Sequence, residues 1–162
     1  MARNSDLADF GSSASAGAVL QTVFNTHSSE SSFTNNTPTA IAGLTQSITL
    51  KSANPYIYVI LAINSFYKAT NNTSLWIKLE ANSDTALDIK LSDMILYNGT
   101  TAANSGSAVQ HYYHNLTNDA AGATITYTPK FYSAANNGTV YINANYTGGG
   151  QISQIILMEI AK

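Results

Sequence analysis

The fold is decided by residues 56–66, which read YIYVILAINSF. Their β-branched and aromatic side chains favour a strand, and the unbroken apolar run from Tyr56 to Ile63 is much shorter than the roughly twenty residues that cross a membrane. In its middle this segment is apolar on both faces that a strand presents. Such a strand is typical of the centre of a sheet, and at an edge it would promote aggregation. We therefore expect a central strand that is covered on both faces.

Shorter alternations of apolar and polar residues lie on both sides of this segment. Just before it, Leu44, Gln46, Ile48 and Leu50 fall on one face of a strand, and Thr and Ser residues fall on the other. Further strands are expected over residues 19–24, 75–81, 87–91, 94–97, 109–115, 123–128, 131–132, 139–146 and 152–161. Asn-Pro, Asn-Asn and Asn-Gly pairs between them favour turns. The pattern predicts an all-β fold, either a two-sheet antiparallel sandwich or a jelly roll, and the spacing does not distinguish these topologies.

The composition points to a surface that is solvated by hydroxyls and amides rather than by ions. Only 10% of the 162 residues are charged and 44% are hydrophobic, while Ser, Thr and Asn supply about a third of the chain. The formal charge is −2, and the single Arg and six Lys form no basic stripe. We therefore expect no nucleic-acid partner and no membrane span. The absence of Cys excludes thiolate metal sites and Cys nucleophiles.

The length and the patterning divide the chain into an arm and one domain. Residues 1–18 sustain no period and lack the apolar block of a signal peptide, so they are expected to form a short extended N-terminal arm. Within this arm only Leu7 and Phe10 offer a sizeable apolar grip, which suits either a docking arm or a plain flexible tail. Residues 19–162 are expected to form a single β-sandwich domain.

No catalytic, cofactor or metal site is expected. His111 and His114 lie three residues apart, and a strand directs such positions to opposite faces, so we expect surface histidines rather than a metal site. Glu159 lies in the last apolar strand and shares a face with Ile155 and Leu157. A carboxylate at such a position is usually satisfied by backbone donors or by a Lys, and we expect this role rather than catalysis.

Aromatic residues in or beside the strands are the best candidates for a binding surface. Tyr and Trp give large contact areas at low entropic cost, and they suit sugars or another protein. The candidates for contact with a glycan or a protein are Trp76, Tyr97, Tyr112 and Tyr113. The alternative interpretation is that half-buried Tyr residues simply suit the rim of a sheet.

Several stretches resemble virion surface proteins of marine, cyanophage-like bacteriophages. They are residues 15–21 (SAGAVLQ), followed by residues 48–50 (ITL), residues 131–143 (FYSAANNGTVYIN) and the final residues 155–161 (IILMEIA). In that family a similar C-terminal β domain forms fibre tips, knobs or other outward projections. Fibre proteins of this kind usually carry a long stalk, whereas the arm here would reach at most about 60 Å when fully extended. The resemblance therefore implies a capsid-exterior knob rather than a fibre.

These considerations predict a non-enzymatic phage structural protein, a knob-like decoration on the outer surface of the virion that is made in the host cytoplasm. The residues expected to dock it are Leu7, Phe10, Val19 and Leu20, and the expected partner is the major capsid protein or another virion protein. The alternative is a tail-fibre tip or receptor-binding adhesin that recognises host surface polysaccharide. A homotrimer and a monomer both remain compatible with the sequence.

Overall fold

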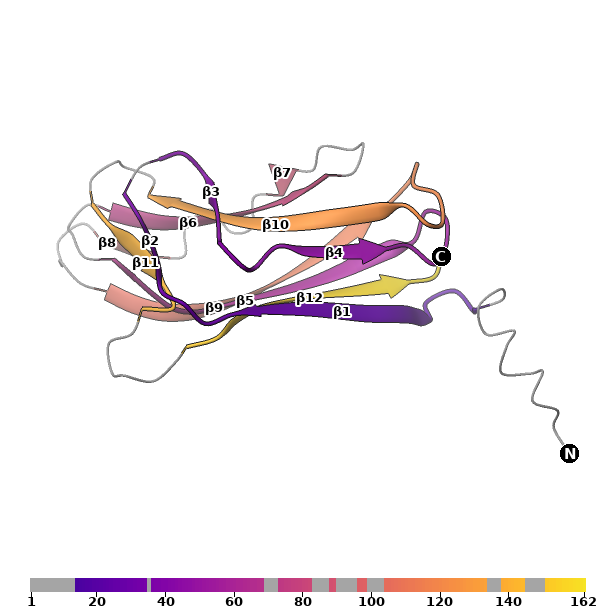
Figure 1. Ribbon diagram of the computed structural model, residues 1–162, viewed down its shortest axis with the longest axis horizontal. Helices are drawn as coiled ribbons and strands as arrows, with labels where there is room; N and C mark the ends of the chain where they lie inside the picture. Colours follow the sequence, from indigo (N-terminus) through magenta and orange to yellow (C-terminus); the bar gives the residue numbers. More distant parts are fainter. Residues whose placement is uncertain are drawn as a thin grey trace, which may run out of the picture.

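The protein is an all-β molecule with two antiparallel sheets, as its computed structural model shows (Figure 1). The structure describes residues 14–34, 36–68, 73–82, 88–89, 96–98, 104–133, 138–144 and 151–162. The strands within these ranges are β1 (Val19–His27), β2 (Ser31–Phe33), β3 (Thr39–Ala40), β4 (Gln46–Thr49), β5 (Tyr56–Lys68), β6 (Thr73–Ala81), β7 (Asp88–Ile89), β8 (Leu96–Asn98), β9 (Asn104–Asn115), β10 (Thr124–Ser133), β11 (Val140–Ile142) and β12 (Ser153–Ile160). None of the described residues forms a helix long and apolar enough to span a membrane. The predicted all-β class is confirmed.

Sheet A contains β1, β2, β5, β9, β11 and β12. Its central strand is β5, which pairs with β9 along one side and with β12 and then β11 along the other. β1 pairs with the far side of β12, and β2 pairs with the far side of β11. The sheet is therefore four strands wide, because β1 with β2, and β12 with β11, each form one interrupted row.

Sheet B contains the remaining strands and has the same width. β10 pairs with β6 on one side, and with β4 and then β3 on the other. β6 in turn pairs with β7 and β8 on its far side. The rows of sheet B are therefore β3 with β4, then β10, then β6, then β7 with β8.

The connectivity of these rows is that of a jelly roll. In chain order the eight rows are β1 with β2, β3 with β4, β5, β6, β7 with β8, β9, β10, and β11 with β12. In sheet A the first row pairs with the eighth and the third with the sixth. In sheet B the second row pairs with the seventh and the fourth with the fifth. A single long hairpin that is folded over on itself gives this order of antiparallel pairs, which defines the jelly roll. The topology thus resolves the choice that the spacing of the sequence left open.

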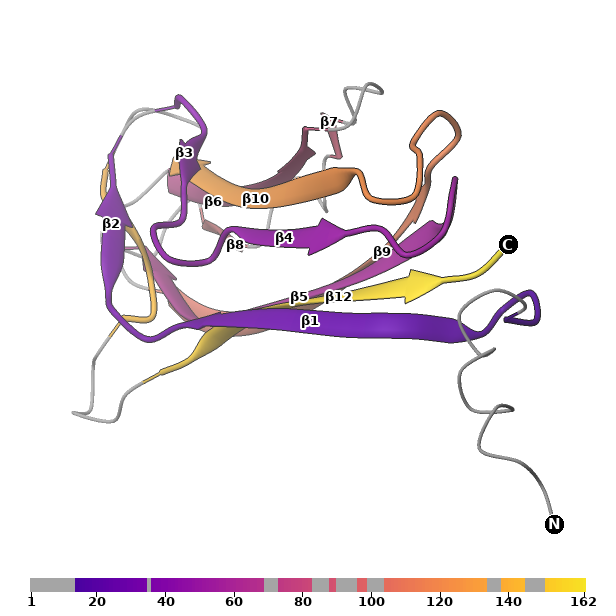
Figure 2. The same ribbon diagram turned by 45° about the vertical axis from the view of Figure 1, so that its right-hand side comes forward.

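Sheet A curls strongly at one end. Figure 2 shows β2 and β11 bending away from the flat part of the sheet towards sheet B. The Phe33 ring of β2 lies 5.7 Å from the Phe131 ring of β10, measured between centroids, so the curled end of one sheet packs on the other. The curl closes this end of the sandwich.

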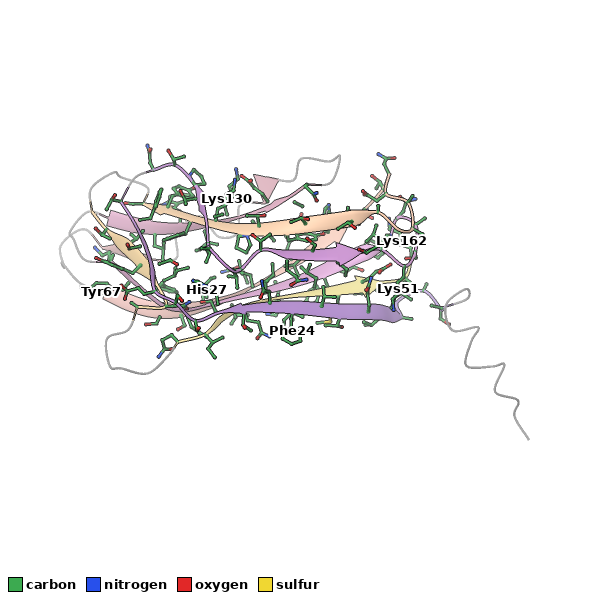
Figure 3. All side chains as sticks on the ribbon, in the orientation of Figure 1. Phe24, His27, Lys51, Tyr67, Lys130 and Lys162 are labelled. Atoms are coloured by element: carbon green, nitrogen blue, oxygen red, sulfur yellow. The ribbon has the colours of Figure 1, made fainter. Side chains whose placement is uncertain are left out.

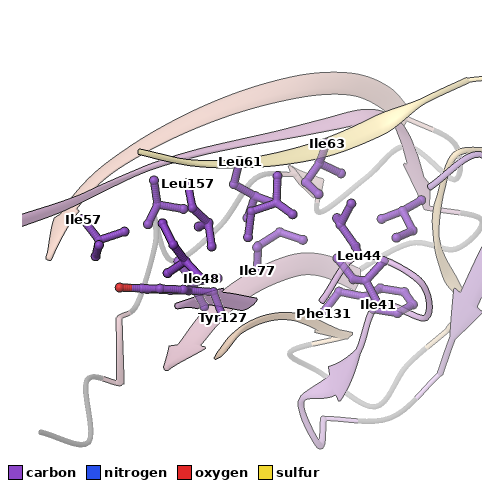
Figure 4. Packing of buried hydrophobic residues seen from close by; sticks show 14 of the residues in the cluster. Ile41, Leu44, Ile48, Ile57, Leu61, Ile63, Ile77, Tyr127, Phe131 and Leu157 are labelled. Atoms are coloured by element: carbon purple, nitrogen blue, oxygen red, sulfur yellow. The ribbon is translucent and has the colours of Figure 1, made fainter. Parts of the chain in front are cut away.

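Alternating side chains of both sheets fill the space between them (Figures 3 and 4). β12 and the first eight residues of β5 bury every second residue, as the period-two pattern predicts, and the alternation of β5 resumes at Phe66 after a bulge. Leu44, Ile48 and Leu50 are buried on one face, as expected. The fully buried apolar residues on sheet A include Ile57, Leu61 and Leu157, and those on sheet B include Ile77, Leu79 and Tyr127.

Two expectations about the strands need comment. β5 is central as predicted; the described residues cover its inward face, and its outward residues are half-buried. The strands expected over residues 123–128 and 131–132 are one strand, β10 (Thr124–Ser133), which continues through Pro129. Pro129 has no N–H, and it lies opposite the interruption between β3 and β4, where no donor is needed.

A buried carboxylate clamps the edge between the two sheets. Glu159 is fully buried and accepts hydrogen bonds from the backbone N–H groups of Lys51 and Ser52, at 3.0 and 2.8 Å. The Ser52 hydroxyl and the Gln21 side-chain amide also donate to it. The expectation that backbone donors satisfy Glu159 is confirmed. The same amide of Gln21 also donates to the carbonyl of Thr49, which ties β1 to β4.

A candidate interaction surface on sheet A

The outward residues of four adjacent strands form one continuous surface, which we call the A face. The register aligns them in four rows that run from β1 through β12 and β5 to β9. The rows are Val19, Ile160, Tyr56 and Asn115; Thr22, Met158, Tyr58 and Tyr113; Phe24, Ile156, Ile60 and His111; and Thr26, Gln154, Ala62 and Val109. Each of these side chains is half-buried or exposed, so the face is open in a single chain.

The A face gathers the exposed apolar side chains of the molecule. Five large hydrophobic residues are exposed in the described part of the chain, and four of them lie on this face. Phe24 is 64% exposed, Val19 and Val109 are each 56% exposed, and Tyr113 is 50% exposed. An exposed apolar residue is unremarkable alone, whereas a contiguous group marks an interaction site.

The A face carries no charged side chain in its four rows. At the end of the face, the ammonium of Lys162 lies 4.9 Å from the centre of the Tyr56 ring. That ammonium also donates to the carbonyl of Leu116. Charged residues are depleted at the centre of protein interfaces because their desolvation is costly, and this face has the same character.

An aromatic cluster holds part of the face in a fixed geometry. The Tyr58 hydroxyl lies 2.7 Å from Nδ1 of His111, and the two rings stack at 5.8 Å between centroids. The Tyr113 ring lies 4.7 Å from the Tyr56 ring and 6.3 Å from the Tyr58 ring. Contacts of this kind fix the rotamers in advance, so a partner would lose less side-chain entropy on binding.

The outer face of sheet B, which we call the B face, has the opposite character. Glu80 forms ion pairs with Lys78, at 3.0 Å, and with Lys130. The hydrogen bond from Lys130 is the largest of the contributions that hold the pKa of Glu80 below its usual value. Figure 3 shows Phe24 and Lys130 on opposite sides of the sandwich. One outer face is thus apolar and uncharged, and the other is polar and ion-paired.

Hydroxyl pairs and one aromatic pair complete the B face. The hydroxyls of Ser47 and Thr126 lie 2.8 Å apart across β4 and β10, and those of Thr49 and Thr124 lie 3.0 Å apart. Towards the other end of β10 the Trp76 and Tyr132 rings lie 5.9 Å apart. These pairs agree with the hydroxyl-rich surface that the composition predicts.

The aromatic residues predicted for contact with a glycan or a protein do not form one site. Tyr113 lies on the A face, whereas Trp76 lies on the B face. Tyr112 points inward and packs against the core. Tyr97 lies in β8, and its side chain is outside the described part of the chain. The candidate group therefore splits between two faces and the interior.

The residues predicted for docking are also separated. Val19 lies on the A face at the start of β1, and the half-buried Leu20 follows it. The carbonyl of Leu20 accepts a hydrogen bond from the Lys51 side chain at 3.2 Å. Leu7 and Phe10 lie outside the described residues. Sequence reasoning missed the neighbours that make Val19 part of a surface, because only the strand register brings them together.

The two histidines lie on opposite faces of β9, as the strand geometry predicts. His111 is exposed on the A face, while His114 is fully buried in the core rather than at the surface, which corrects the expectation for that residue. Among the described residues no group of three or more His, Cys, Asp or Glu side chains is placed to hold a metal ion.

Together these features define a jelly-roll domain with one apolar outer face. No protein-family model matches the chain, and no curated protein matches its sequence. The structure of infectious bursal disease virus Gx strain matches with 10% identity and a TM-score of 0.43, over 91% of this chain and 38% of that one. Dimeric latent PorU from Porphyromonas gingivalis matches with 10% identity and a TM-score of 0.31, over 93% of this chain and 14% of that one. The chain thus spans well under half of either, and neither likeness carries an argument about function.

Proposed function

We propose that this protein is a non-enzymatic structural protein of a virion, a knob-like decoration on the outside of the capsid. The observation that carries the proposal is the contrast between the apolar A face and the polar B face. A protein that is built into an assembly needs one surface for burial and another for water. Ion pairs and hydroxyl pairs suit the B face to solvent, and the uncharged A face suits contact within the particle.

Two further features support this function. Jelly rolls recur in viral capsid and lectin domains, although the same fold also serves unrelated functions. Residues 131–143 and 155–161 resemble virion surface proteins of marine bacteriophages, and they supply β11, β12 and the end of β10. These segments include the strand that carries Ile156 and Met158 of the A face.

The proposed anchor is the N-terminal arm together with the start of β1. In this proposal Leu7 and Phe10 grip the shell, with Val19 and Leu20 beside them, and the partner is the major capsid protein or another virion protein. The decisive experiment deletes residues 2–17 and measures incorporation into particles. The truncated protein is expected to fold but to be absent from purified particles. Arm-less protein that still loads onto capsids would exclude the docking role.

Imaging provides the second half of this test. Labelled protein on purified particles should decorate the shell, and labelling of the tail alone would exclude a capsid decoration. A control deletion of residues 2–5, which spares Leu7 and Phe10, should load normally. Purified protein is expected to leave capsular polysaccharide intact, and turnover of that polysaccharide would contradict the non-enzymatic assignment.

The aromatic cluster on the A face supports a second candidate, a receptor-binding tip for host surface polysaccharide. Tyr56, Tyr58 and Tyr113 offer ring faces, and sugars stack on such faces. Particles that lack this protein separate the two functions. Unimpaired adsorption to the host would count against the receptor-binding function, while loss of adsorption with normal capsid stability would favour it.

A further inference from the structure

The two central strands of sheet A have apolar residues on both faces. In β5 the inward Ile57, Val59 and Leu61 alternate with outward residues that include Ile60 and Ala62. In β12 the inward Ile155 and Leu157 alternate with outward Ile156, Met158 and Ile160. Antiparallel sheets with one solvated face normally alternate apolar and polar residues, so strands of this composition indicate cover on both faces. The described chain provides that cover on the inward face alone.

The A face is large enough for a specific interface. Four strands about 4.8 Å apart and about eight residues long, at about 3.3 Å per residue, give a face of about 19 by 26 Å. That projection is about 500 Å², and protruding side chains such as Phe24 raise the accessible area above it. A standard interface buries about 800 Å² on each partner, and smaller ones are weak but specific. The A face is therefore large enough for a weak, specific association.

One polar pair of the face is already satisfied within it. The Tyr58 hydroxyl and Nδ1 of His111 satisfy each other across the face, so covering them leaves this donor and acceptor paired. Thr26 and Gln154 lie in the last row, where they would form part of a polar rim. An apolar centre with a polar rim is the common anatomy of a protein interface.

The charge distribution favours an identical partner. The chain has a net charge of −2, and bringing charged surfaces of two copies together would cost free energy through like-charge repulsion. The four rows of the A face carry no charge, so two copies meet there without such a penalty. Two sheets also pack well face to face, about 10 Å apart with strands inclined by about 30°.

We propose that the A face is the interface of a homodimer, in which two copies pack sheet A against sheet A about a twofold axis. A twofold arrangement uses the same patch on both copies, so most of the face is buried in one contact, while Val19 lies in the row at its end, next to the arm. With the axis parallel to the strands, β1 of one copy lies over β9 of the other. Phe24 then faces the partner's His111, with Val109 and Tyr113 of that strand on either side of it, and this contact occurs twice. The proposal does not depend on the virion location.

The test uses the full chain and measures its mass in solution by sedimentation velocity, from about 1 to about 100 μM. We expect twice the 17.2 kDa monomer mass at the upper end. Phe24→Glu and Val109→Glu place a carboxylate in the interface from its two opposite edges. Each should raise the dissociation constant at least about 100-fold, because a charged side chain would lose its hydration in an otherwise apolar contact. Ser47→Glu, on the exposed B face, is the matched control and should leave the mass unchanged.

Each other outcome has a definite meaning. Phe24 and Val109 are more than half exposed, so both variants should keep the wild-type circular-dichroism spectrum. A wild-type monomer at about 100 μM, a mass of three copies, or variants that remain dimeric would overturn the twofold interface. A monomer whose Phe24→Glu variant folds but fails to load onto particles would overturn it too. That result would show that the A face binds a different virion protein, and it would leave the proposed function standing.

Discussion

The hydroxyl of Tyr127 lies 2.7 Å from Nδ1 of His114, and this hydrogen bond joins sheet B to sheet A inside the core. The rings meet edge to face with centroids 5.8 Å apart, and Figure 4 shows the Tyr127 ring beside the buried apolar residues, with its hydroxyl at the edge of the drawn cluster. Nε2 of His114 is buried without a hydrogen-bond partner in the described structure. Burial lowers the pKa of His114 from 6.5 to about 4, and burial is also the largest cause of the raised pKa of Tyr127. The imidazole is therefore neutral in the folded protein at pH 7.

This buried imidazole predicts a loss of stability in mild acid. The unfolded chain binds a proton at His114 below pH 6.5, whereas the folded chain resists it until about pH 4. The free energy of unfolding is therefore highest above pH 6.5, and it decreases by up to about 3 kcal/mol as the pH falls from 6.5 to about 4. Urea unfolding at several pH values measures the slope. His114→Gln should flatten it, and His111→Gln, at the exposed histidine of the same strand, is the matched substitution. Equal slopes in wild type and His114→Gln would show that His114 does not cause the loss of stability in acid.

The buried carboxylate predicts a second, larger effect on stability. Glu159→Leu removes the acceptor of the Lys51 and Ser52 backbone N–H groups and of the Ser52 hydroxyl, and it leaves these partly buried donors without this partner. We expect a loss of about 3–5 kcal/mol in the free energy of unfolding. Glu80→Gln is the control, because its carboxylate lies in partly exposed ion pairs and should cost less than about 1 kcal/mol. If chemical denaturation gave similar decreases in the free energy of unfolding for both substitutions, the hydrogen bonds of Glu159 would not stabilise the fold more than the ion pairs of Glu80 do.

The alternation of residues in the sequence predicted much of the fold but little of the surface. Residues 56–66 identified the central strand, and the alternation around Ile48 placed its buried side chains correctly. Alternation tells which residues of one strand share a face, yet it gives neither the neighbouring strand nor the register. Phe24, Ile156 and His111 therefore looked unrelated, although the register places them in one row. Trp76 and Tyr113 looked alike, although they lie on opposite outer faces.

Asn143, which directly follows β11, is a third position where a substitution should lower stability. Asn143 has a φ of 52°, in the left-handed region that Asn tolerates better than most residues. Its side-chain amide donates to the carbonyls of His27, at 2.8 Å, and Ser29, at 3.2 Å, and its side-chain oxygen accepts from the Ser153 hydroxyl.

Asn143→Ala removes these bonds and adds backbone strain, so we expect a loss of about 2–4 kcal/mol. Asn143→Gly keeps the conformational freedom but loses the bonds, and it should fall between Asn143→Ala and wild type. Asn118→Ala, at an exposed position, is the control and should change thermal unfolding little. If Asn143→Gly were as unstable as Asn143→Ala, the strain contribution would be absent.

The pairing of Phe66 with Gly106 predicts a steric effect that a second substitution can reverse. The two residues lie opposite each other in β5 and β9, and a Cβ at Gly106 would meet the Phe66 ring at 2.9 Å. Phe66 is buried, so its ring has little room to move, and Gly106→Ala should cost about 1–3 kcal/mol in the free energy of unfolding. A smaller side chain removes the clash, so adding Gly106→Ala to Phe66→Leu should cost much less than adding it to wild type.

Gly122→Ala is the control. A Cβ at Gly122 meets no atom within 4 Å, and the φ of 87° strains its backbone whatever the neighbours are. The cost of Gly122→Ala should therefore be the same with Phe66 and with Phe66→Leu. A double-mutant cycle with no coupling between Phe66 and Gly106 would show that the ring does not restrict this position.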